Sequence, residues 1–342
     1  MVSGGELAIL PEELIVVTGA NGFIGSHVVD QLLLAGYNVR GTVRDSQKTS
    51  WLQVRSRRFS LAEVPEMFTP GAFDDSFKGA SGMVHIATPV MRHYDPFVAI
   101  ISVVNGALEA LRPAAKEPKL TRVVMTSSST AAASPQPNKE FVIDENTWNQ
   151  SAVKAAWAPP PYEGSQRRVD VYAGSKTQSE EAAWKFMKEE KPHFVLNTVL
   201  PNANMSKILS VEHQGYSSTN GWLKSHWDGF PGEEGKEISL TPPQYYINVQ
   251  DNARVHVAAL VYTDVKNERL FTFAHPYSWN DILAVFRKLY PQKKFVDDIP
   301  NIAEDKSKVA NKRAEDLLKG FAGLPGWTSL EHSVKDATER WQ

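Results

Sequence analysis

The first half of the chain alternates short apolar runs with longer segments in which apolar residues recur at helical spacing. The short runs are rich in valine, isoleucine and leucine, as in strands that are buried on both faces. They predict strands over residues 14–18, 38–44, 82–87, 121–127 and 194–200. The longer segments predict helices over residues 26–35, 96–116 and 172–190. This alternation predicts an α/β protein with a doubly wound parallel sheet that carries helices on both faces.

The second half of the chain loses this rhythm after residue 200. Proline, glycine and tryptophan gather between residues 215 and 243, and amphipathic patterns predict helices over 281–290, 304–319 and 328–341. We therefore expect a first domain over residues 1–200 and a smaller mixed α/β C-terminal substrate lobe over residues 201–342. Part of the segment 249–275 could return to the first domain.

Composition and charge exclude several functional classes. The chain has 342 residues, 42% of them hydrophobic, and a formal net charge of −2, so we expect neither nucleic acid nor an anionic membrane as a partner. There is no cysteine, which excludes disulfides and thiolate chemistry. The histidines form no pattern typical of a metal site, and we expect no metal. The first eleven residues lack a signal-peptide pattern, and we expect a cytoplasmic protein.

Three glycines follow the first predicted strand. Gly19, Gly22 and Gly25 have the spacing G-x-x-G-x-x-G between that strand and the next predicted helix. Glycine lets the backbone approach a pyrophosphate, and the free amides at a helix N-terminus favour its negative charge. A strand before the motif and a helix after it favour a dinucleotide site over an ordinary tight turn. The first domain is therefore predicted to be a dinucleotide-binding Rossmann domain.

The end of the second predicted strand distinguishes between the two nicotinamide dinucleotides. NAD enzymes tend to place a carboxylate there, against the ribose 2′-hydroxyl. This chain has Arg44 at that position and Lys48 shortly after it, and both cations can meet a 2′-phosphate. Asp45 lies beside Arg44, and we expect its carboxylate to point outward. The pattern favours NADP(H) as the cofactor, and solvated surface cations are the alternative interpretation.

A tyrosine and a lysine four residues apart supply candidate acid–base chemistry. Tyr172 and Lys176 share one face of a predicted helix. A phenol has an unperturbed pKa of about 10, and a nearby ammonium lowers this pKa by favouring the phenolate. A hydroxyl-rich run over residues 126–129 closes an upstream strand, at the edge where doubly wound sheets bind ligands. These features predict that a hydroxyl holds a carbonyl group while Tyr172 protonates its oxygen after hydride addition.

Taken together, the motifs resemble a known family. The glycine loop, the second strand, the 126–128 strand end and the Tyr172–Lys176 pair are similar to the extended short-chain dehydrogenases/reductases of the dihydroflavonol-reductase type. Similarity to the fungal NADPH-dependent carbonyl (aldehyde) reductases of that branch rests on residues 183–187, 191–194, 200–202, 242–246, 286–291 and 325–327. The resemblance covers nearly the whole chain. It implies reduction of ketones or aldehydes to alcohols, in which Tyr172 is the general acid.

The resemblance also implies roles for individual residues. Ser128, rather than Ser127 or Ser129, is the expected catalytic serine, and Lys176 is expected to lower the pKa of Tyr172 and bind the nicotinamide ribose. Besides the glycines, Arg44 and Lys48, the expected cofactor contacts are Phe23, Ile24, Glu66, Met67, Ala87, Thr88, Tyr172, Lys176, Pro201 and Asn202. Glu66 stands where the family usually has an aspartate beside the adenine. The expected substrate pocket contains Ser128, Tyr172, Pro89, Val90, Trp222, Thr241 and Gln244.

Aromatic residues are frequent in the region expected to line the pocket. Trp222, Trp227, Tyr245 and Tyr246 all fall there. A pocket with these side chains would favour hydrophobic or aromatic ketones and aldehydes as small-molecule substrates. The alternative interpretation is that the aromatic side chains pack between the two lobes.

Several other polar residues are expected to have no catalytic role. His85 lies in a predicted buried strand and is expected to be a hydrogen-bonded core residue. The D-E-x-x-W pattern of residues 144–148 is expected to be structural. Arg167 and Arg168 are expected to face solvent.

Two other functions share this fold. A nucleotide-sugar epimerase or dehydratase would hold NAD tightly and would need a polar or basic site for the nucleotide diphosphate; the basic strand end and the aromatic second lobe count against it. A non-catalytic regulator that senses NADP(H) would have lost the tyrosine and the lysine, which this chain retains. We expect an enzyme that acts as a monomer or a homodimer.

Overall fold

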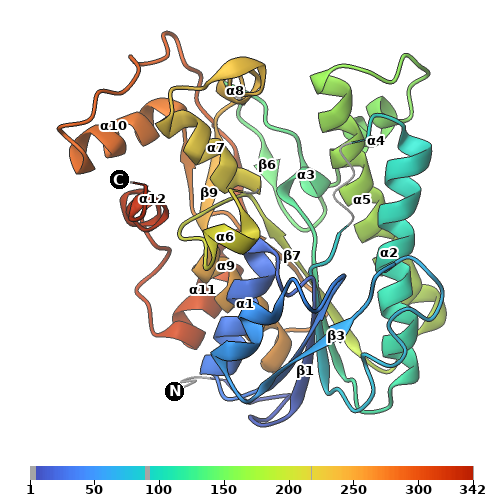
Figure 1. Cartoon of the computed structure of the whole chain (residues 1–342). Helices are drawn as coiled ribbons and strands as arrows, with labels where there is room; N and C mark the ends of the chain where they lie inside the picture. The colour runs from blue at the N-terminus through green and yellow to red at the C-terminus, as the bar shows by residue number, and fades with distance from the viewer. Residues whose placement is uncertain (1–4, 89–92, 217, 342) are drawn as a thin grey trace.

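The protein is described by a computed structural model that covers residues 5–88, 93–216 and 218–341 (Figure 1). Within these residues, seven strands form the main sheet, in the order β10-β7-β5-β4-β1-β2-β3. The strands are β1 Leu14–Thr18, β2 Asn38–Val43, β3 Phe59–Glu63, β4 Gly82–His85, β5 Arg122–Thr126, β7 Val195–Pro201 and β10 Arg269–Thr272. All neighbouring strands of this sheet are parallel, and the order reverses direction between β1 and β4. The fold is therefore α/β with a doubly wound sheet, as predicted.

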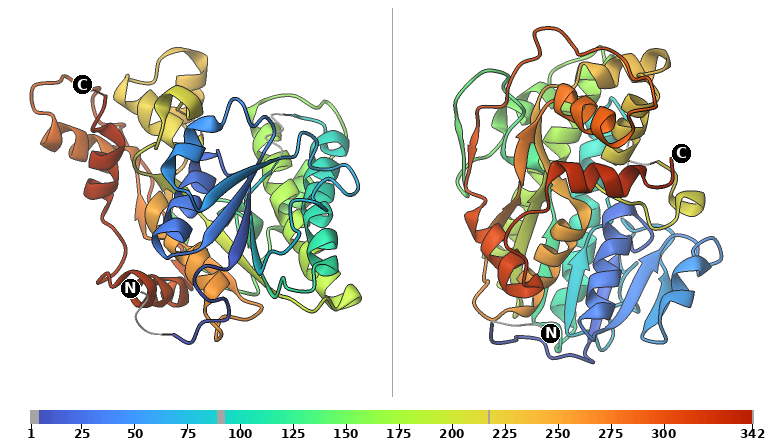
Figure 2. Two further views of the ribbon diagram at one scale, coloured as in Figure 1. Left: turned by 60° about the horizontal axis from the view of Figure 1, so that its bottom comes forward. Right: turned by 90° about the vertical axis from the view of Figure 1, so that its left-hand side faces the viewer.

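Helices cover both faces of the main sheet, as the left view of Figure 2 shows. One face carries α1 Phe23–Leu34, α9 Val249–Val261 and α11 Lys312–Ala322, and the other carries α2 Pro96–Lys116, α4 Gln150–Ala156 and α5 Ser165–Glu190. In β1, Ile15 and Val17 belong to the apolar cluster on the α1 side, and Val16 belongs to the cluster on the α2 side. A continuous apolar run is needed because successive side chains of a strand enter opposite layers.

The smaller lobe lies at the upper left of Figure 1. It contains a second sheet in the order β11-β9-β8, with β8 Ala203–Met205, β9 Gln244–Asn248 and β11 His275–Tyr277. Its helices are α6 Val211–Gln214, α7 Ser218–Trp227, α8 Gly232–Ser239, α10 Trp279–Leu289 and α12 Leu330–Thr338. The segment between β9 and β11 leaves this lobe. It forms helix α9, which packs on the main sheet, and strand β10, which is the edge strand of that sheet.

Some element boundaries differ from the sequence predictions. Helix α5 begins at Ser165, seven residues before the predicted start, because Val171 extends the packed face and clusters with Ile100 of α2 and Ala156 of α4. The helix predicted over 304–319 begins only at Lys312. The preceding residues form β12 Lys308–Val309, which pairs with β6 Val142–Ile143. Strand β3 was not predicted, because its second to fifth residues are partly or fully exposed and break the apolar run.

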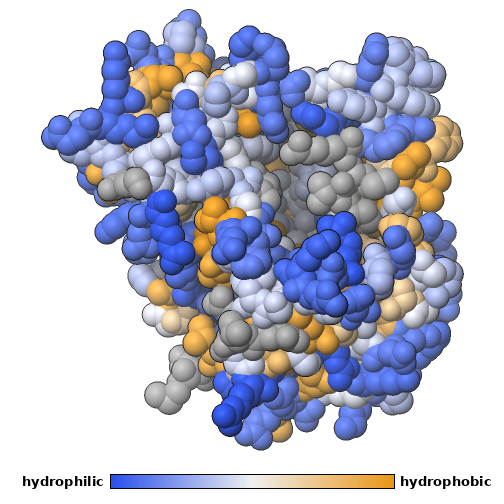
Figure 3. Space-filling view, viewed as in Figure 1, coloured by the Kyte–Doolittle hydropathy of each residue, from blue (hydrophilic) through white to orange (hydrophobic). Residues whose placement is uncertain are grey.

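Helix α2 is 21 residues long, with a mean hydropathy of 1.4 in its most apolar window, which by length and composition alone would allow it to cross a membrane. Its buried residues, among them Ile100, Val103 and Ala107, recur every three or four positions, as in a helix that covers a sheet. At its N-terminal end Phe97 is exposed and contacts Trp157 edge to face, with ring centroids 5.0 Å apart. Apolar surface of this kind is visible at the right of Figure 3.

A buried arginine joins the start of β5 to the end of α9. Arg122 is 3% exposed, and its guanidinium donates to the backbone carbonyls of Ala259, Leu260, Tyr262 and Val265. The last carbonyls of a helix have no partner within the helix, and Arg122 helps to satisfy them. Asn197 Nδ2 also donates to the carbonyls of Ala259 and Val265.

We expect Arg122→Leu to destabilise the protein by about 2–4 kcal/mol, because the buried carbonyls of Leu260 and Tyr262 lose the donor that Arg122 supplies. The measurement is the midpoint of urea unfolding, with the exposed Arg340 changed to Leu as the matched control. Equal midpoints for the two variants would show that Arg122 does not support α9.

Candidate active site

The glycine loop forms a tight cradle at the N-terminus of α1. Gly19 has a φ of +66°, which side chains disfavour, and a Cβ on Gly25 would lie 2.1 Å from the Gly19 carbonyl oxygen. Gly22 begins the helix without any side-chain cap, so the first amides of α1 remain available for an anion. A loop that only glycine can form, leading into an uncapped helix N-terminus, fits a pyrophosphate group.

A hydroxyl at the end of β1 fixes the end of β4 beside this cradle. Thr18 Oγ1 accepts hydrogen bonds from the amides of Ile86 and Ala87, at 3.0 and 3.1 Å. It also bonds His85 Nδ1 at 2.9 Å. Burial lowers the pKa of His85 to about 3, so the ring is neutral and acts as a hydrogen-bonded core residue. This role of Thr18 was not predicted, because its partners lie 67 or more residues away in the sequence.

The basic strand end is exposed and open to a ligand. Arg44 follows β2 directly and is exposed. Asp45 accepts hydrogen bonds from the amides of Gln47 and Lys48, and its carboxylate lies 3.2 Å from the Lys48 ammonium. The hydrogen bonds from Lys48 lower the pKa of Asp45. Lys48 is thus partly neutralised within its own loop, and Arg44 is the stronger candidate for an incoming phosphate.

The expected adenine contacts lie after β3. Glu66 is exposed in the loop that follows this strand. Met67 is partly buried and packs against the apolar cluster between the sheet and α2. Of the two, only Glu66 has a side chain open to a ligand.

A short helix of the smaller lobe holds the glycine loop from the other side. Gln214, at the end of α6, donates through Nε2 to the carbonyls of Asn21 and Gly22, each at 3.1 Å, and to Ser26 Oγ at 3.0 Å. Its neighbour His213 stacks on Trp51, with ring centroids 5.5 Å apart. Phe23 also meets the smaller lobe, since it clusters with Ile208 and Val249, and Ile24 packs against this cluster. Sequence reasoning missed Gln214, because its partners lie 188 or more residues away.

Ser128 is positioned to donate a hydrogen bond outward. It caps the short helix α3 Ser129–Ala132, and its Oγ accepts hydrogen bonds from the amide and the hydroxyl of Thr130, at 3.2 and 2.9 Å. Because both of these bonds are accepted, the hydroxyl proton of Ser128 can be donated to another group, and Ser128 hydrogen-bonds Tyr172. Ser127 points elsewhere, since its hydroxyl donates to Glu180. Ser127 is therefore bound away from Tyr172, and the role of Ser128 as the catalytic serine stays a prediction.

Tyr172 lies on α5 beside Ser128. The residue is 47% exposed, so a ligand can reach it. Burial raises the pKa of Tyr172, and hydrogen bonding with Ser128 partly opposes this. The phenol therefore keeps its proton at neutral pH, which suits a proton donor.

Lys176 binds the end of β4. Its ammonium donates to Thr88 Oγ1 at 2.8 Å, and the residue is 7% exposed. Burial lowers the pKa of Lys176 to about 8, against the charge of Glu180, which raises it. The predicted lowering of the Tyr172 pKa by Lys176 is not seen in this structure, because burial dominates at Tyr172 and the ammonium is bonded to Thr88. Lys176 is mainly protonated at pH 7.

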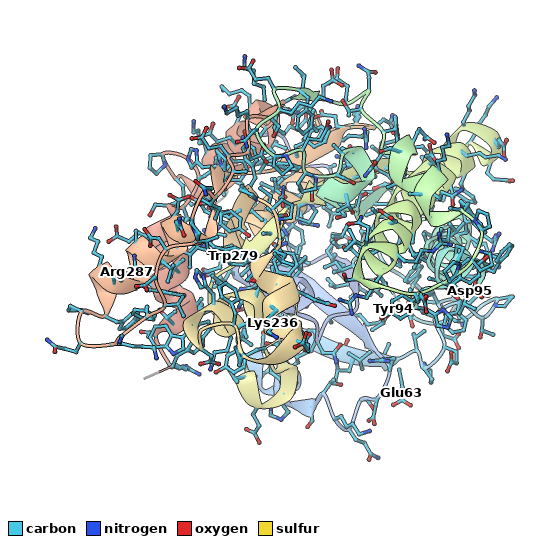
Figure 4. The ribbon with its side chains drawn as sticks, turned by 90° about the horizontal axis from the view of Figure 1, so that it is seen from above. Glu63, Tyr94, Asp95, Lys236, Trp279 and Arg287 are labelled. Atoms are coloured by element: carbon cyan, nitrogen blue, oxygen red, sulfur yellow. The ribbon has the colours of Figure 1, made fainter. Side chains whose placement is uncertain are left out.

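The surface is hollowed between the two lobes, as Figure 3 shows. In Figure 4, Lys236 of α8 and Tyr94 lie on opposite sides of this opening. An ion pair crosses it, because Arg168 of α5 lies 2.8 Å from Glu237 of α8. Arg167 beside it donates to the carbonyls of Ala155 and Ala158. The expectation that these two arginines only face solvent is therefore wrong, because both bind neighbouring elements.

Three groups of predicted residues remain: two belong to the expected substrate pocket, and the third is the expected cofactor contacts Pro201 and Asn202. Pro89 and Val90 lie outside the described residues. Trp222 is partly buried against the apolar cluster of the smaller lobe, Thr241 is partly buried and Gln244 is buried. Pro201 ends β7 and is buried, and Asn202 follows it, partly exposed, at the edge of the main sheet that also carries Ser128.

The other aromatic residues of this region pack in the core. Trp227 is 7% exposed and contacts Phe286 edge to face. The hydroxyls of Tyr245 and Tyr246 donate to the carbonyls of Ser307 and Thr328. Of the four aromatic residues, these three therefore serve packing, and their number carries no information about the substrate.

Among the described residues, no group of three or more histidine, aspartate or glutamate side chains is placed to hold a metal ion. The D-E-x-x-W loop is structural, as predicted, because Arg269 donates to the carbonyls of Glu145 and Thr147 and stacks on Trp148 at 3.8 Å.

The chain is similar to known proteins over nearly its whole length. A family model described as "NAD dependent epimerase/dehydratase family" matches residues 15–203. The chain is 44% identical over 338 residues to "Aldehyde reductase 2" of Sporidiobolus salmonicolor, which covers 96% of each protein. It is 39% identical over 340 residues to "NAD-dependent epimerase/dehydratase terH" of Aspergillus terreus, covering 96% of this chain and 97% of that protein.

Among solved structures, Gre2 from Candida albicans in complex with NADPH has a TM-score of 0.81 to this chain. The two are 25% identical, and the match covers 96% of this chain and 98% of Gre2. The family match, the doubly wound sheet and the glycine loop agree with one another. The chain therefore belongs to the NAD-dependent epimerase/dehydratase family, the extended short-chain dehydrogenases/reductases, and is an oxidoreductase.

Proposed function

We propose that this protein reduces ketones or aldehydes to alcohols with NADPH, and that Tyr172 is the proton donor. The observation that carries the proposal is the meeting of three groups at one sheet edge. Ser128 has a hydroxyl proton to donate and hydrogen-bonds Tyr172, Tyr172 is accessible and protonated, and the Lys176 ammonium is bound beside the glycine loop through Thr88. The similarity to an aldehyde reductase supports carbonyl reduction, and the similarity to a structure that contains NADPH supports the cofactor.

In this proposal, the reduced nicotinamide supplies a hydride to the carbonyl carbon when it is bound. Ser128 donates a hydrogen bond to the carbonyl oxygen and holds it beside the phenol of Tyr172. As negative charge develops on that oxygen, Tyr172 gives up its proton to it. Lys176 stabilises the resulting phenolate by its charge, and its remaining N–H groups can bind ribose hydroxyls. Solvent then returns the proton to Tyr172.

The choice of NADPH over NADH rests on the end of β2. Arg44 is exposed there, and the nearest carboxylate, Asp45, is bound within its own loop and is not free to meet a ribose 2′-hydroxyl. A guanidinium can bind a phosphate through two parallel hydrogen bonds. The proposed order of importance is therefore Arg44 first and Lys48 second.

We expect Tyr172→Phe to lower kcat by about 100- to 10,000-fold, because the variant lacks the proton donor. NADPH binding should stay within about twofold, since the phenol contributes little to it in this proposal. Initial rates with a panel of aromatic ketones and a fluorescence titration with NADPH measure the two effects. Tyr290→Phe, which loses only a hydroxyl contact with Thr338, is the control and should keep its activity. Near-normal turnover of Tyr172→Phe would rule out this mechanism.

We expect Arg44→Ala to raise the Kd for NADPH by about 10- to 100-fold, the usual effect of removing a charged hydrogen bond. The Kd for NADH should change by less than about threefold, because NADH lacks the 2′-phosphate. Titration calorimetry with both cofactors measures the difference, and Arg340→Ala serves as the control. Equal losses for both cofactors would mean that Arg44 does not meet the 2′-phosphate.

We expect Gln214→Ala to raise the Kd for NADPH by about three- to tenfold, because the carbonyls of the glycine loop lose their shared donor. The same titration measures this effect. Gln166→Ala, an exposed glutamine on α5 that bonds only Asp170 in this structure, is the control. An unchanged Kd for Gln214→Ala would show that α6 does not stabilise the cradle.

A further inference from the structure

A buried carboxylate lies behind the candidate active site. Glu180 of α5 is fully buried, and its Oε2 accepts a hydrogen bond from Ser127 Oγ at 2.7 Å. Its Oε1 accepts from Thr198 Oγ1 and from Arg269 Nε, each at 2.8 Å. Ser127 follows β5, Thr198 lies in β7 and Arg269 begins β10. One side chain therefore attaches three strands of the main sheet to α5.

The same helix face carries the candidate catalytic residues. Lys176 lies four residues before Glu180, and Tyr172 lies eight residues before it, so all three are on one side of α5. On the strand side, Ser127 is directly followed by Ser128. The Glu180–Ser127 hydrogen bond is thus one residue from Ser128 and two helical turns from Tyr172. This hydrogen bond connects the end of β5, which carries Ser128, to helix α5, which carries Tyr172. The separation of these two segments sets the distance between the serine and the tyrosine.

A second set of contacts reaches Ser128 through Arg269. The arginine holds the 145–148 loop by two backbone carbonyls and by stacking on Trp148. Asn149, which follows this loop, donates to the carbonyl of Thr130 at 2.8 Å. Thr130 in turn donates to Ser128 through its amide and hydroxyl. The Arg269–Glu180 ion pair is therefore connected to Ser128 on both sides.

Stability alone does not account for this ion pair. A buried ion pair is often no more stabilising than well-packed apolar residues, because two charges must be removed from water. Here the side chains of Ser127, Thr198 and Arg269 all donate to the Glu180 carboxylate. Trp184 Nε1 donates to it as well, at 3.3 Å, so the carboxylate is held in one orientation. Fixed geometry at this position is useful if the residues around it must be held at catalytic distances.

We propose that Glu180 is a positioning residue for the proposed carbonyl reduction: it holds Ser127, and with it Ser128, at a fixed distance from the helix that carries Tyr172 and Lys176. This inference rests on the proposed function.

The charge of Glu180 has a second effect, since it raises the pKa of Lys176 against burial. Within the described residues, the neutral His85 on β4 also interacts with the charge of Lys176, and Thr88 accepts its hydrogen bond. Tyr172 lies four residues before Lys176 on the same helix. Because a carboxylate favours the ammonium form, removal of its charge should lower the pKa of Lys176 below about 8.

The test compares Glu180→Gln with Glu181→Gln, which removes a neighbouring carboxylate that bonds Gln150 of α4 instead. For Glu180→Gln we expect kcat to fall about 10- to 100-fold, while the Kd for NADPH stays within about threefold. The pKa of Lys176, measured by NMR of side-chain-labelled lysine in the cofactor-free protein, should fall. The basic limb of the kcat profile should move to lower pH with it. Glu181→Gln should match the unchanged protein in each measurement.

Ser127→Ala tests positioning without removing the buried charge, and it decides the matter if Glu180→Gln does not fold. We expect kcat to fall about three- to tenfold, with an unchanged Lys176 pKa. The inference would be overturned if Ser127→Ala kept the wild-type kcat. It would also be overturned if Glu180→Gln were less stable but kept the wild-type kcat and the wild-type pKa of Lys176. If the unchanged protein reduces no carbonyl compound, the proposed function itself is wrong. If the unchanged protein is active and both variants have the same kcat as that protein, only the proposed role of Glu180 is wrong.

Discussion

The buried carboxylate of Glu180 is the contact on which the site depends most. In a parallel sheet the carboxyl ends of the strands meet at one edge, but hydrogen bonds within the sheet do not fix a helix above that edge. Glu180 supplies this attachment by binding Ser127, Thr198 and Arg269 at once. Its helix then presents Tyr172 toward the same edge. The sheet provides the platform, and apolar packing together with this buried ion pair sets where α5 lies on it.

Two further contacts complete the arrangement. Thr18 fixes the end of β4 against β1, so that Thr88 lies where the Lys176 ammonium can bind it. Gln214 holds the glycine loop from the smaller lobe, which makes the nucleotide cradle depend on both lobes. The glycine loop and the region around Tyr172 are therefore not separate modules. Each is built from short polar contacts between segments that are far apart in the sequence.

This distance explains what the sequence could and could not predict. The glycine loop and the Tyr172–Lys176 pair are local patterns, and the alternation of elements predicts the doubly wound sheet. The roles of Thr18, Glu180 and Gln214 depend on partners that no local spacing reveals, and Gln214 meets the glycine loop across nearly 200 residues. The prediction of an aromatic substrate pocket from the aromatic content was wrong for Trp227, Tyr245 and Tyr246 for a related reason. Composition places side chains in a region but does not show whether they point into a cleft or into the core.

In the proposed mechanism, a hydride passes to a carbonyl carbon held beside Tyr172. The most direct measurement uses an aromatic ketone with NADPH deuterated at C4, one stereoisomer at a time, and mass spectrometry and NMR of the alcohol. We predict that one stereoisomer gives an alcohol with deuterium on the carbinol carbon and that the other gives none. Deuterium from neither stereoisomer, with hydrogen from solvent on that carbon instead, would contradict direct hydride transfer.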